Sequence, residues 1–170
     1  MNATATMKTL VLNEEQVGQK IRRIAYEIYE NNFSEKKIVL AGIDGQGYEF
    51  AKILDKELKK ISSLDTLLAK VSVDKLSPVQ SEIKVDVPVK ELKNRCVILI
   101  DDVLNTARTL AYAMKPLLVT EVKRIEVAVL VNRSHTVFPI TPTYTGFELA
   151  TTLTDHVEVK LGKGAAVYLR

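Results

Sequence analysis

The stretch VILIDDVLNTART, which runs from Val97 to Thr109, decides the fold. It continues an uninterrupted apolar run, CVILI, that ends at Ile100, and such a run is typical of a strand buried in a parallel sheet. The run stops at two adjacent acids, Asp101 and Asp102, and a loop rich in small and hydroxyl-bearing residues follows. The spacing then predicts a helix over Thr109–Leu118 that is disturbed near Pro116. Strand, polar loop and helix in this order indicate a ligand-binding turn in an α/β domain.

The residues of this loop match the chemistry of a phosphorylated sugar. Asp101 and Asp102 are acceptors at neutral pH and can take hydrogen bonds from the vicinal hydroxyls of a ribose. Backbone N–H groups of Asn105–Thr109 can point at an anion, and the helix that follows adds the positive end of its dipole. The alternative is that two acids merely end a strand and cap a helix. Two acids directly after a fully apolar strand are not explained by a role in folding alone, so the pattern favours a ligand site.

Similar strand and helix signals precede this stretch. Asn13 and Gln16 form a variant capping box for an amphipathic helix predicted over Glu14–Glu30. The run Lys37–Ile43 is a second buried strand, and it stops at the tight loop Asp44–Gly47. A second amphipathic helix is predicted over Phe50–Ile61 and a further strand over Thr66–Val73.

The rest of the chain continues the alternation less regularly. The segment from Ile83 to Lys90 alternates apolar and polar residues, which predicts a half-buried strand, with Pro88 suggesting a sheet edge. Arg124–Val131 is another strand. Asn132–Thr152 is rich in loop residues. The end of the chain is predicted to form two short strands, Val157–Leu161 and Val167–Leu169, around Gly162-Lys163-Gly164.

This order predicts an α/β fold, an open, mostly parallel twisted sheet with helices on both faces. Residues 1–170 are expected to form a single domain, and residues 1–12 a flexible N-terminal tail. Ligands of such sheets bind beyond the carboxyl ends of the strands. Two loops meet that description, Asp44–Gly47 and Asp101–Thr109.

Composition narrows the functional class. The net charge of +3 arises from 24 basic and 21 acidic residues, so it does not indicate a nucleic-acid binder. The single cysteine, Cys96, opens an apolar run and is interpreted as a buried, inert thiol. The sequence contains neither a span long enough for a bilayer nor a secretory signal, so no membrane association and a cytoplasmic location are expected.

The segment VILIDDVLNTART resembles the phosphoribosyl-pyrophosphate (PRPP) motif of type I phosphoribosyltransferases. The similarity extends to KIVLAGIDGQGYEFAKIL and to IEVAVLVNRSHTVFPITPTYTGFELATT, and it covers nearly all of the chain after Leu10. The order and spacing resemble one subfamily, the bacterial pyrimidine-operon attenuation regulator that also has uracil phosphoribosyltransferase activity. The segment VNRSHTVFPI points to this pyrimidine subfamily.

The resemblance implies a type I phosphoribosyltransferase fold with a role for each segment. Asp101 and Asp102 would be the catalytic pair that holds the ribose hydroxyls. The flexible loop Asp74–Glu82 would close over the reacting centre, and a hood, Asn132–Ile140, would recognise the base. Magnesium would bridge sugar and pyrophosphate mainly through ligand oxygens and water, without a protein metal site. The implied substrate-binding residues are Ile43, Asp44, Gly45, Gln46 and Gly47 in the pyrophosphate loop, Val103, Leu104, Asn105, Thr106, Ala107, Arg108 and Thr109 around the 5′-phosphate, and Arg133 and His135.

Two departures from the family pattern affect this interpretation. The subfamily carries basic residues in the pyrophosphate loop, whereas Asp44 and Gln46 stand here. Losing one electrostatic donor to a transition state costs about 2.7–4 kcal/mol, which predicts a slow enzyme or none, unless Asp44 points away and caps the following helix. The family has glycine at the position of Ala107, and a Cβ there costs roughly 1–2 kcal/mol if φ is positive.

The leading hypothesis is a transferase that joins uracil to PRPP, giving UMP and pyrophosphate, with a homodimer as its assembly. One rival is a pyrimidine-nucleotide-binding regulator without catalysis. Another is an RNA-binding transcription attenuator, which needs a continuous basic face. Lys20, Arg22, Arg23, Lys36 and Lys37 gather around the first helix, but a solvated face explains them better, so RNA is the less favoured partner. His135 could contact a base or a phosphate, or be a surface residue.

Overall fold

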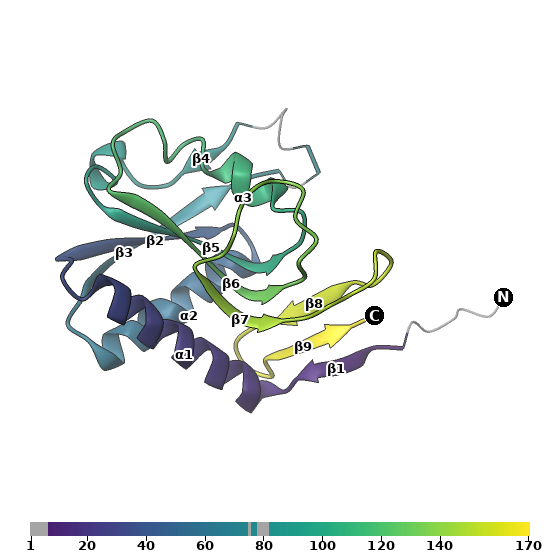
Figure 1. Cartoon of the computed structure of the whole chain (residues 1–170). Helices are drawn as coiled ribbons and strands as arrows, with labels where there is room; N and C mark the ends of the chain where they lie inside the picture. The colour runs from purple at the N-terminus through teal and green to yellow at the C-terminus, as the bar shows by residue number, and fades with distance from the viewer. Residues whose placement is uncertain (1–6, 75, 78–81) are drawn as a thin grey trace.

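The computed structural model describes residues 7–74, 76–77 and 82–170, and its centre is a six-stranded sheet (Figure 1). All neighbouring strands run parallel except β3 and β4. The predicted open, mostly parallel sheet is therefore confirmed. In spatial order the strands are β4 (Lys84–Val85), β3 (Asp65–Ser72), β2 (Lys37–Ile43), β5 (Cys96–Leu104), β6 (Arg124–Asn132) and β7 (Tyr144–Glu148).

The sheet is buried on both faces, and each face has its own core. Along β5, Ile98 joins the cluster under α1 (Glu14–Asn32) and α2 (Gln46–Ile61), whereas Leu99 joins the opposite cluster. That opposite cluster lies under α3 (Arg108–Ala113). Successive residues of a strand point to opposite faces, so a continuous apolar run is what a sheet covered on both sides requires. Figure 1 shows helices on both faces, as predicted.

A second, three-stranded antiparallel sheet lies beside the main one (Figure 1). It contains β8 (Val157–Lys160) and β9 (Ala166–Leu169), which confirms the two predicted strands at the end of the chain. Its third strand, β1 (Thr9–Leu12), pairs with β9. The prediction of a flexible tail over residues 1–12 is therefore wrong for Thr9–Leu12, because β9 supplies hydrogen-bonding partners distant in sequence. Residues 1–6 lie outside the described residues.

The structure corrects three other predictions. The helix expected over Thr109–Leu118 ends at Ala113, and the chain continues as turns over residues 114–119, which include Pro116, a residue without an N–H for a helix. The alternating segment from Ile83 forms only β4, because β4 pairs with the last residues of β3 and Pro88 then precedes a 3-10 turn, η1 (Val89–Glu91). The segment Asn132–Thr152 contains a full strand, β7, which the loop-rich composition concealed.

Gly146 explains why β7 fits. A Cβ added at Gly146 would lie 2.6 Å from the backbone oxygen of Leu130 on β6. The glycine therefore lets β7 approach β6 closely, although glycine usually weakens a strand.

Of the predicted flexible loop Asp74–Glu82, residues 75 and 78–81 lie outside the described residues.

Among the helices that the structure describes, none has the length and apolar character needed to cross a membrane.

Candidate ligand-binding site

The two predicted loops lie next to each other at one edge of the sheet. The pyrophosphate loop, Ile43–Gly47, follows β2, and the phosphate loop, Asn105–Thr109, follows β5, its parallel neighbour. Gly47 is buried against β5, and a Cβ added to it would lie 2.9 Å from the Ile100 backbone oxygen and 3.0 Å from an Asp101 carboxylate oxygen. Only glycine allows the pyrophosphate loop to pack this closely against the strand that carries Asp101.

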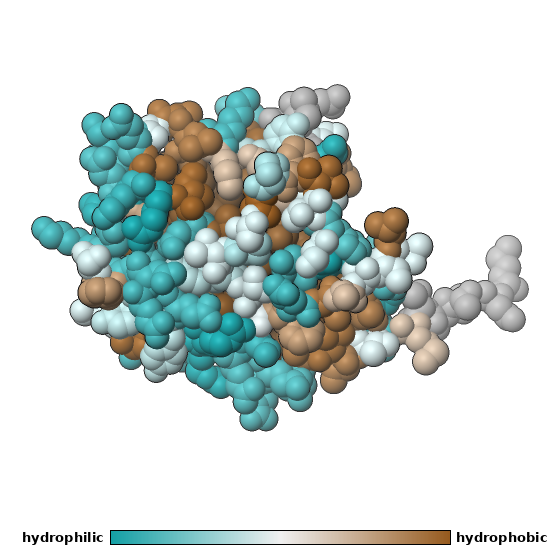
Figure 2. All heavy atoms as spheres, viewed as in Figure 1, coloured by the Kyte–Doolittle hydropathy of each residue, from teal (hydrophilic) through white to brown (hydrophobic). Residues whose placement is uncertain are grey.

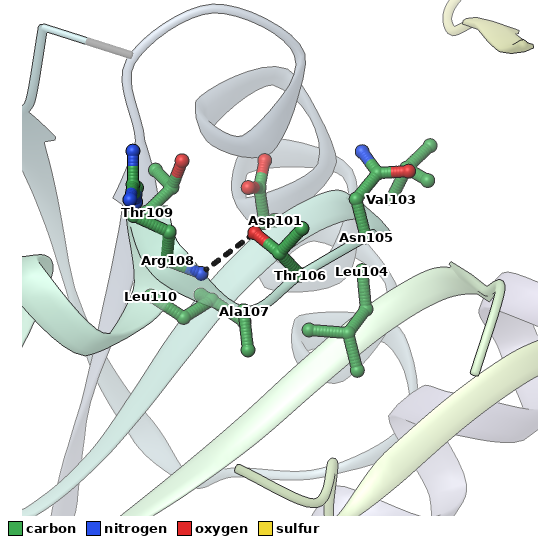
Figure 3. Close-up of a pocket in the computed structure, with 9 residues that line it drawn as sticks. All are labelled: Asp101, Val103, Leu104, Asn105, Thr106, Ala107, Arg108, Thr109 and Leu110. Carbon is green, nitrogen blue, oxygen red and sulfur yellow. Dashed lines mark hydrogen bonds between the residues drawn. The ribbon is translucent and has the colours of Figure 1, made fainter. Parts of the chain in front are cut away.

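The phosphate loop surrounds a small recess of about 50 Å³ (Figure 3). The Arg108 backbone N–H donates to the Thr106 hydroxyl at 3.3 Å, which fixes the turn into α3. This helix has only six residues, so its dipole contributes less than the predicted ten-residue helix would. The recess has the size and the N–H-rich backbone that a small anion needs. Its lining residues are Asp101, Val103, Leu104, Asn105, Thr106, Ala107, Arg108, Thr109 and Leu110.

The two acids differ in accessibility. Asp101 is only 3% exposed and accepts a hydrogen bond from the Asp102 backbone N–H at 2.9 Å. Asp102 is half-buried, so its carboxylate is the more accessible of the pair. No group of three histidine, cysteine or acidic residues that could hold a metal ion occurs within residues 7–74, 76–77 and 82–170.

The backbone of the site is strained at two residues. Ala107 adopts φ +69° and Ser134 adopts φ +58°, the left-handed region that L-residues disfavour. The question that the sequence left open at Ala107 is thereby answered, because this position does require a positive φ. Ala107 is also only 4% exposed, so its methyl group is held in the core under α3. Such strain persists where surrounding contacts impose the conformation, and it gathers at functional sites.

The pyrophosphate loop presents an exposed acid. The Asp44 side chain is 58% exposed and accepts a hydrogen bond from the neighbouring Gly45 N–H at 2.9 Å. Gly45, at φ +93°, is the N-cap of α2, and no side chain caps that helix. The alternative in which Asp44 caps α2 is therefore wrong.

Lys70, which the sequence analysis did not single out, places a positive charge beside this loop. It lies on β3 opposite Gly42 of β2, and its ammonium is 4.0 Å from the Asp44 carboxylate. It also stands 4.8 Å from the ring centroid of Tyr48, and Lys52 stands 5.3 Å from the same centroid. The available signal was one basic residue near the carboxyl end of β3, after the apolar run Leu67-Leu68-Ala69.

The hood borders a larger recess of about 450 Å³. Arg133 and His135 line it, together with Thr151 and Glu148. The His135 Nε2 lies 2.9 Å from the Thr151 backbone oxygen, and the Arg133 guanidinium reaches Asn105 in the phosphate loop at 2.7 Å. The structure thus brings the predicted hood residues to the predicted phosphate loop.

The basic residues of the first helix are largely engaged in local contacts. Arg23 bonds Glu27 and the backbone oxygens of Thr145 and Gly146, so it fastens α1 to β7. Lys20 lies 5.7 Å from the ring centroid of Phe147. These contacts disfavour the continuous, free basic face that RNA would need.

Cys96 lies at the start of β5, the end opposite the site. It is fully buried, and burial raises the pKa of its thiol to about 12. A thiol that stays protonated is a poor nucleophile, which confirms its interpretation as an inert core residue.

Comparison with known proteins agrees with this geometry. Residues 9–162 match the family model described as the phosphoribosyl transferase domain, so the chain belongs to that family. Within it, the chain is similar to proteins named bifunctional protein PyrR. The relative from Streptococcus sanguinis is 36% identical, with 91% of this chain and 92% of the relative covered. The relative from Clostridium beijerinckii is 32% identical, with 91% of each covered.

Solved structures support the fold. The hypoxanthine phosphoribosyltransferase of Trypanosoma cruzi superposes with a TM-score of 0.72 at 16% identity, over 83% of this chain and 81% of that one. A hypoxanthine-guanine phosphoribosyltransferase from Bacillus anthracis gives 0.69 at 19% identity, over 82% and 81%. At these identities the likeness concerns architecture alone, which the predicted type I phosphoribosyltransferase fold matches.

Proposed function

We propose that this protein binds PRPP and pyrimidine nucleotides and transfers the phosphoribosyl group to uracil slowly, giving UMP. The observation that carries the proposal is the phosphate loop after β5, where a recess, two acids and a helix start meet. Membership of the phosphoribosyl transferase family and similarity to bifunctional PyrR proteins support it.

Each part of the site has a task in this proposal. Backbone N–H groups of Asn105–Thr109 bind the 5′-phosphate, and Asp101 and Asp102 accept hydrogen bonds from the ribose hydroxyls. The hood recess receives the base. Magnesium bound with PRPP would be held near Asp101 and Asp102, since carboxylate oxygens suit this ion, and it would supply positive charge to the pyrophosphate.

The reaction is a displacement at C1′ of the sugar. Uracil N1 forms the new bond and loses its proton, while the bond to pyrophosphate breaks and the leaving group takes the electron pair. The residues around the leaving group determine the rate, because charge accumulates on it in the transition state. Asp44 opposes this charge and Lys70 partly offsets Asp44. Slow turnover follows.

A specific observation also favours a second candidate, a regulator that binds nucleotide without catalysis. Neither Asp44 nor Gln46 can supply a positive charge, whereas the phosphate loop needs no charged side chain for its N–H groups. UMP has no pyrophosphate group, so its binding does not depend on the pyrophosphate loop.

The deciding experiment measures UMP formation from uracil and PRPP, with UMP binding measured in parallel by calorimetry. UMP binding with slow turnover supports the transferase. UMP binding with no turnover above the uncatalysed rate supports the regulator. If the protein neither binds UMP nor forms UMP from uracil and PRPP, both candidates are contradicted.

We also propose that the protein forms a homodimer. Figure 2 shows hydrophobic residues gathered over β4 and α3, whereas hydrophilic residues dominate over α1 and α2. Near α3, Leu118 and Val119 are 62% and 64% exposed, and Val119 lines a largely apolar recess with Val85 and Val89. Sedimentation at micromolar concentration should show a dimer, and a pure monomer would contradict this assembly.

A further inference from the structure

The guanidinium of Arg133 is almost fully occupied within the protein. Its Nε donates to the Thr151 hydroxyl at 2.9 Å, and one terminal nitrogen donates to the backbone oxygens of Thr152 at 3.1 Å and Asp155 at 2.7 Å. The other terminal nitrogen donates to the Asn105 side-chain oxygen at 2.7 Å. Arg133 is 9% exposed. Four of the five N–H donors of an arginine are therefore used, which leaves one for any ligand.

These bonds join two parts of the site that are distant in sequence. Asn105 opens the phosphate loop, whereas Thr151, Thr152 and Asp155 form a turn between β7 and β8, here called the hood turn. The turn is closed by the Asp155 carboxylate, which accepts from the Thr152 N–H at 2.7 Å.

The backbone of the hood itself is hydrogen-bonded to the same phosphate loop. The Thr106 backbone oxygen accepts from the N–H groups of Val137 at 2.9 Å and Phe138 at 3.1 Å. The phosphate loop thus contacts the hood through the backbone of Val137 and Phe138, and it reaches the hood turn through the side chains of Asn105 and Arg133.

We propose that Arg133 is a positioning residue that couples the phosphate loop to the hood turn through Asn105, so that filling the phosphate recess orders the surface that receives the base. The inference rests on the proposed function, because it concerns the same site. It changes the role implied by the family resemblance, from substrate contact to positioning. Arginine suits this task since its planar fork bonds several acceptors in fixed directions, which a lysine ammonium cannot reproduce.

The test compares wild type with Arg133→Lys, Asn105→Ala and the double variant. Ribose 5-phosphate is the probe, because it fills the phosphate recess without a base. Amide hydrogen exchange is followed at Thr152 and Asp155, whose N–H groups are hydrogen-bonded within the turn. Arg22→Lys, at an exposed position on α1, is the matched control.

In wild type and Arg22→Lys, saturating ribose 5-phosphate should slow exchange of these amides by about 5-fold or more, the lower end of ordinary coupling between sites. In Arg133→Lys and Asn105→Ala the slowing should disappear while ribose 5-phosphate still binds. UMP affinity should fall by about 10-fold in each single variant and no further in the double, because residues that act as a unit are not additive.

Three other results would overturn the inference. Loss of UMP affinity in Arg133→Lys but not in Asn105→Ala would assign Arg133 to direct contact with the base. Faster exchange in all states, with the slowing by ribose 5-phosphate unchanged, would make Arg133 a purely structural residue. A wild type that binds neither ribose 5-phosphate nor UMP would reject the proposed function together with this coupling, whereas the first two results leave the function standing.

Discussion

The phosphate loop and the pyrophosphate loop occupy equivalent places after neighbouring parallel strands, yet they differ in the charges near them and in the contacts that hold them. The phosphate loop after β5 is held by the Arg133 side chain through Asn105 and by the hood backbone through Thr106. The pyrophosphate loop after β2 presents the exposed Asp44, which lies 4.0 Å from the ammonium of Lys70 on another strand. Backbone recognition tolerates changes of side chain, whereas side-chain recognition is lost with a single substitution. The comparison therefore predicts that this protein binds UMP well although it synthesises UMP slowly.

The largest effect should come from giving the pyrophosphate loop the basic character of its family. Asp44→Lys combined with Gln46→Arg should raise UMP synthesis by about 10²-fold, because one added donor to the leaving group is worth about 2.7–4 kcal/mol. UMP affinity should stay nearly unchanged, since UMP has no pyrophosphate. Steady-state kinetics and calorimetry on the same preparations measure both quantities.

The control for this prediction is Asp65→Lys, which makes the same change of charge as Asp44→Lys alone, at the opposite end of β3 from Lys70. It should leave turnover unchanged. A wild-type rate already typical of enzymes, around 1–10³ s⁻¹, or no gain from the double substitution, would break the comparison. Lys70 would then be the residue that supplies the missing charge.

The next effect concerns the acids beside the phosphate loop. Asp102→Asn should weaken UMP binding by roughly 10-fold or more, since hydrogen bonds to a charged group contribute about 1.5–3 kcal/mol. The melting temperature should change little, because Asp102 is only half-buried at the end of its strand. Asp65→Asn is the matched control. A large loss of melting temperature with unchanged affinity would assign Asp102 to structure.

A smaller effect tests the strain in the phosphate loop. Ala107→Gly relieves a left-handed alanine, whereas Ala113→Gly removes a buried methyl group from the ordinary helix α3. Both residues are at least 96% buried, with exposures of 4% and 0%. Ala107→Gly should therefore be the more stable variant by about 1–2 kcal/mol, or roughly 2–8 °C in melting temperature for a chain of this length. Equal melting temperatures would show that Ala107 carries no strain.

Much of the fold could be predicted from local patterns. The apolar runs located β2, β5 and β6, and the capping box of Asn13 and Gln16 marked the start of α1 correctly. These features depend on neighbouring residues alone. Strands β1 and β7 could not be found in this way, because their stability comes from pairing with β9 and β6, which are remote in sequence.

In the candidate site, too, the features that depend on neighbouring residues could be predicted, whereas those that depend on residues remote in sequence could not. The sequence identified both loops, since each follows an apolar strand and is short and polar. It did not reveal Lys70, which reaches the site from a neighbouring strand, or the occupation of Arg133 by the hood turn. The positive φ at Ala107 also needed coordinates, because alanine by itself indicates no turn. The catalytic and binding roles of the site residues remain predictions.

The smallest effect concerns the support that the hood turn gives to the phosphate loop. The backbone N–H of Thr152 donates to Asp155 and holds the pKa of that carboxyl below its usual range. A carboxyl whose pKa is lower in the folded state stabilises the fold above its unfolded pKa, near 4, and loses this contribution as pH falls through the folded pKa.

Asp155→Ala should therefore melt at a slightly lower temperature than wild type at pH 6, and the difference should shrink as pH falls below about 4 and vanish once pH lies below the folded pKa of Asp155. The effect should be small because the carboxyl is exposed to solvent, where hydrogen bonds to charge are weakened. Asp65→Ala serves as the control at an exposed strand end. UMP affinity at pH 6 should fall with the melting temperature, since the hood turn reaches the phosphate loop through Arg133 and Asn105. A melting difference that persists unchanged into acid would show that the carboxylate charge does not hold the turn, and an unchanged UMP affinity would separate the turn from the phosphate loop.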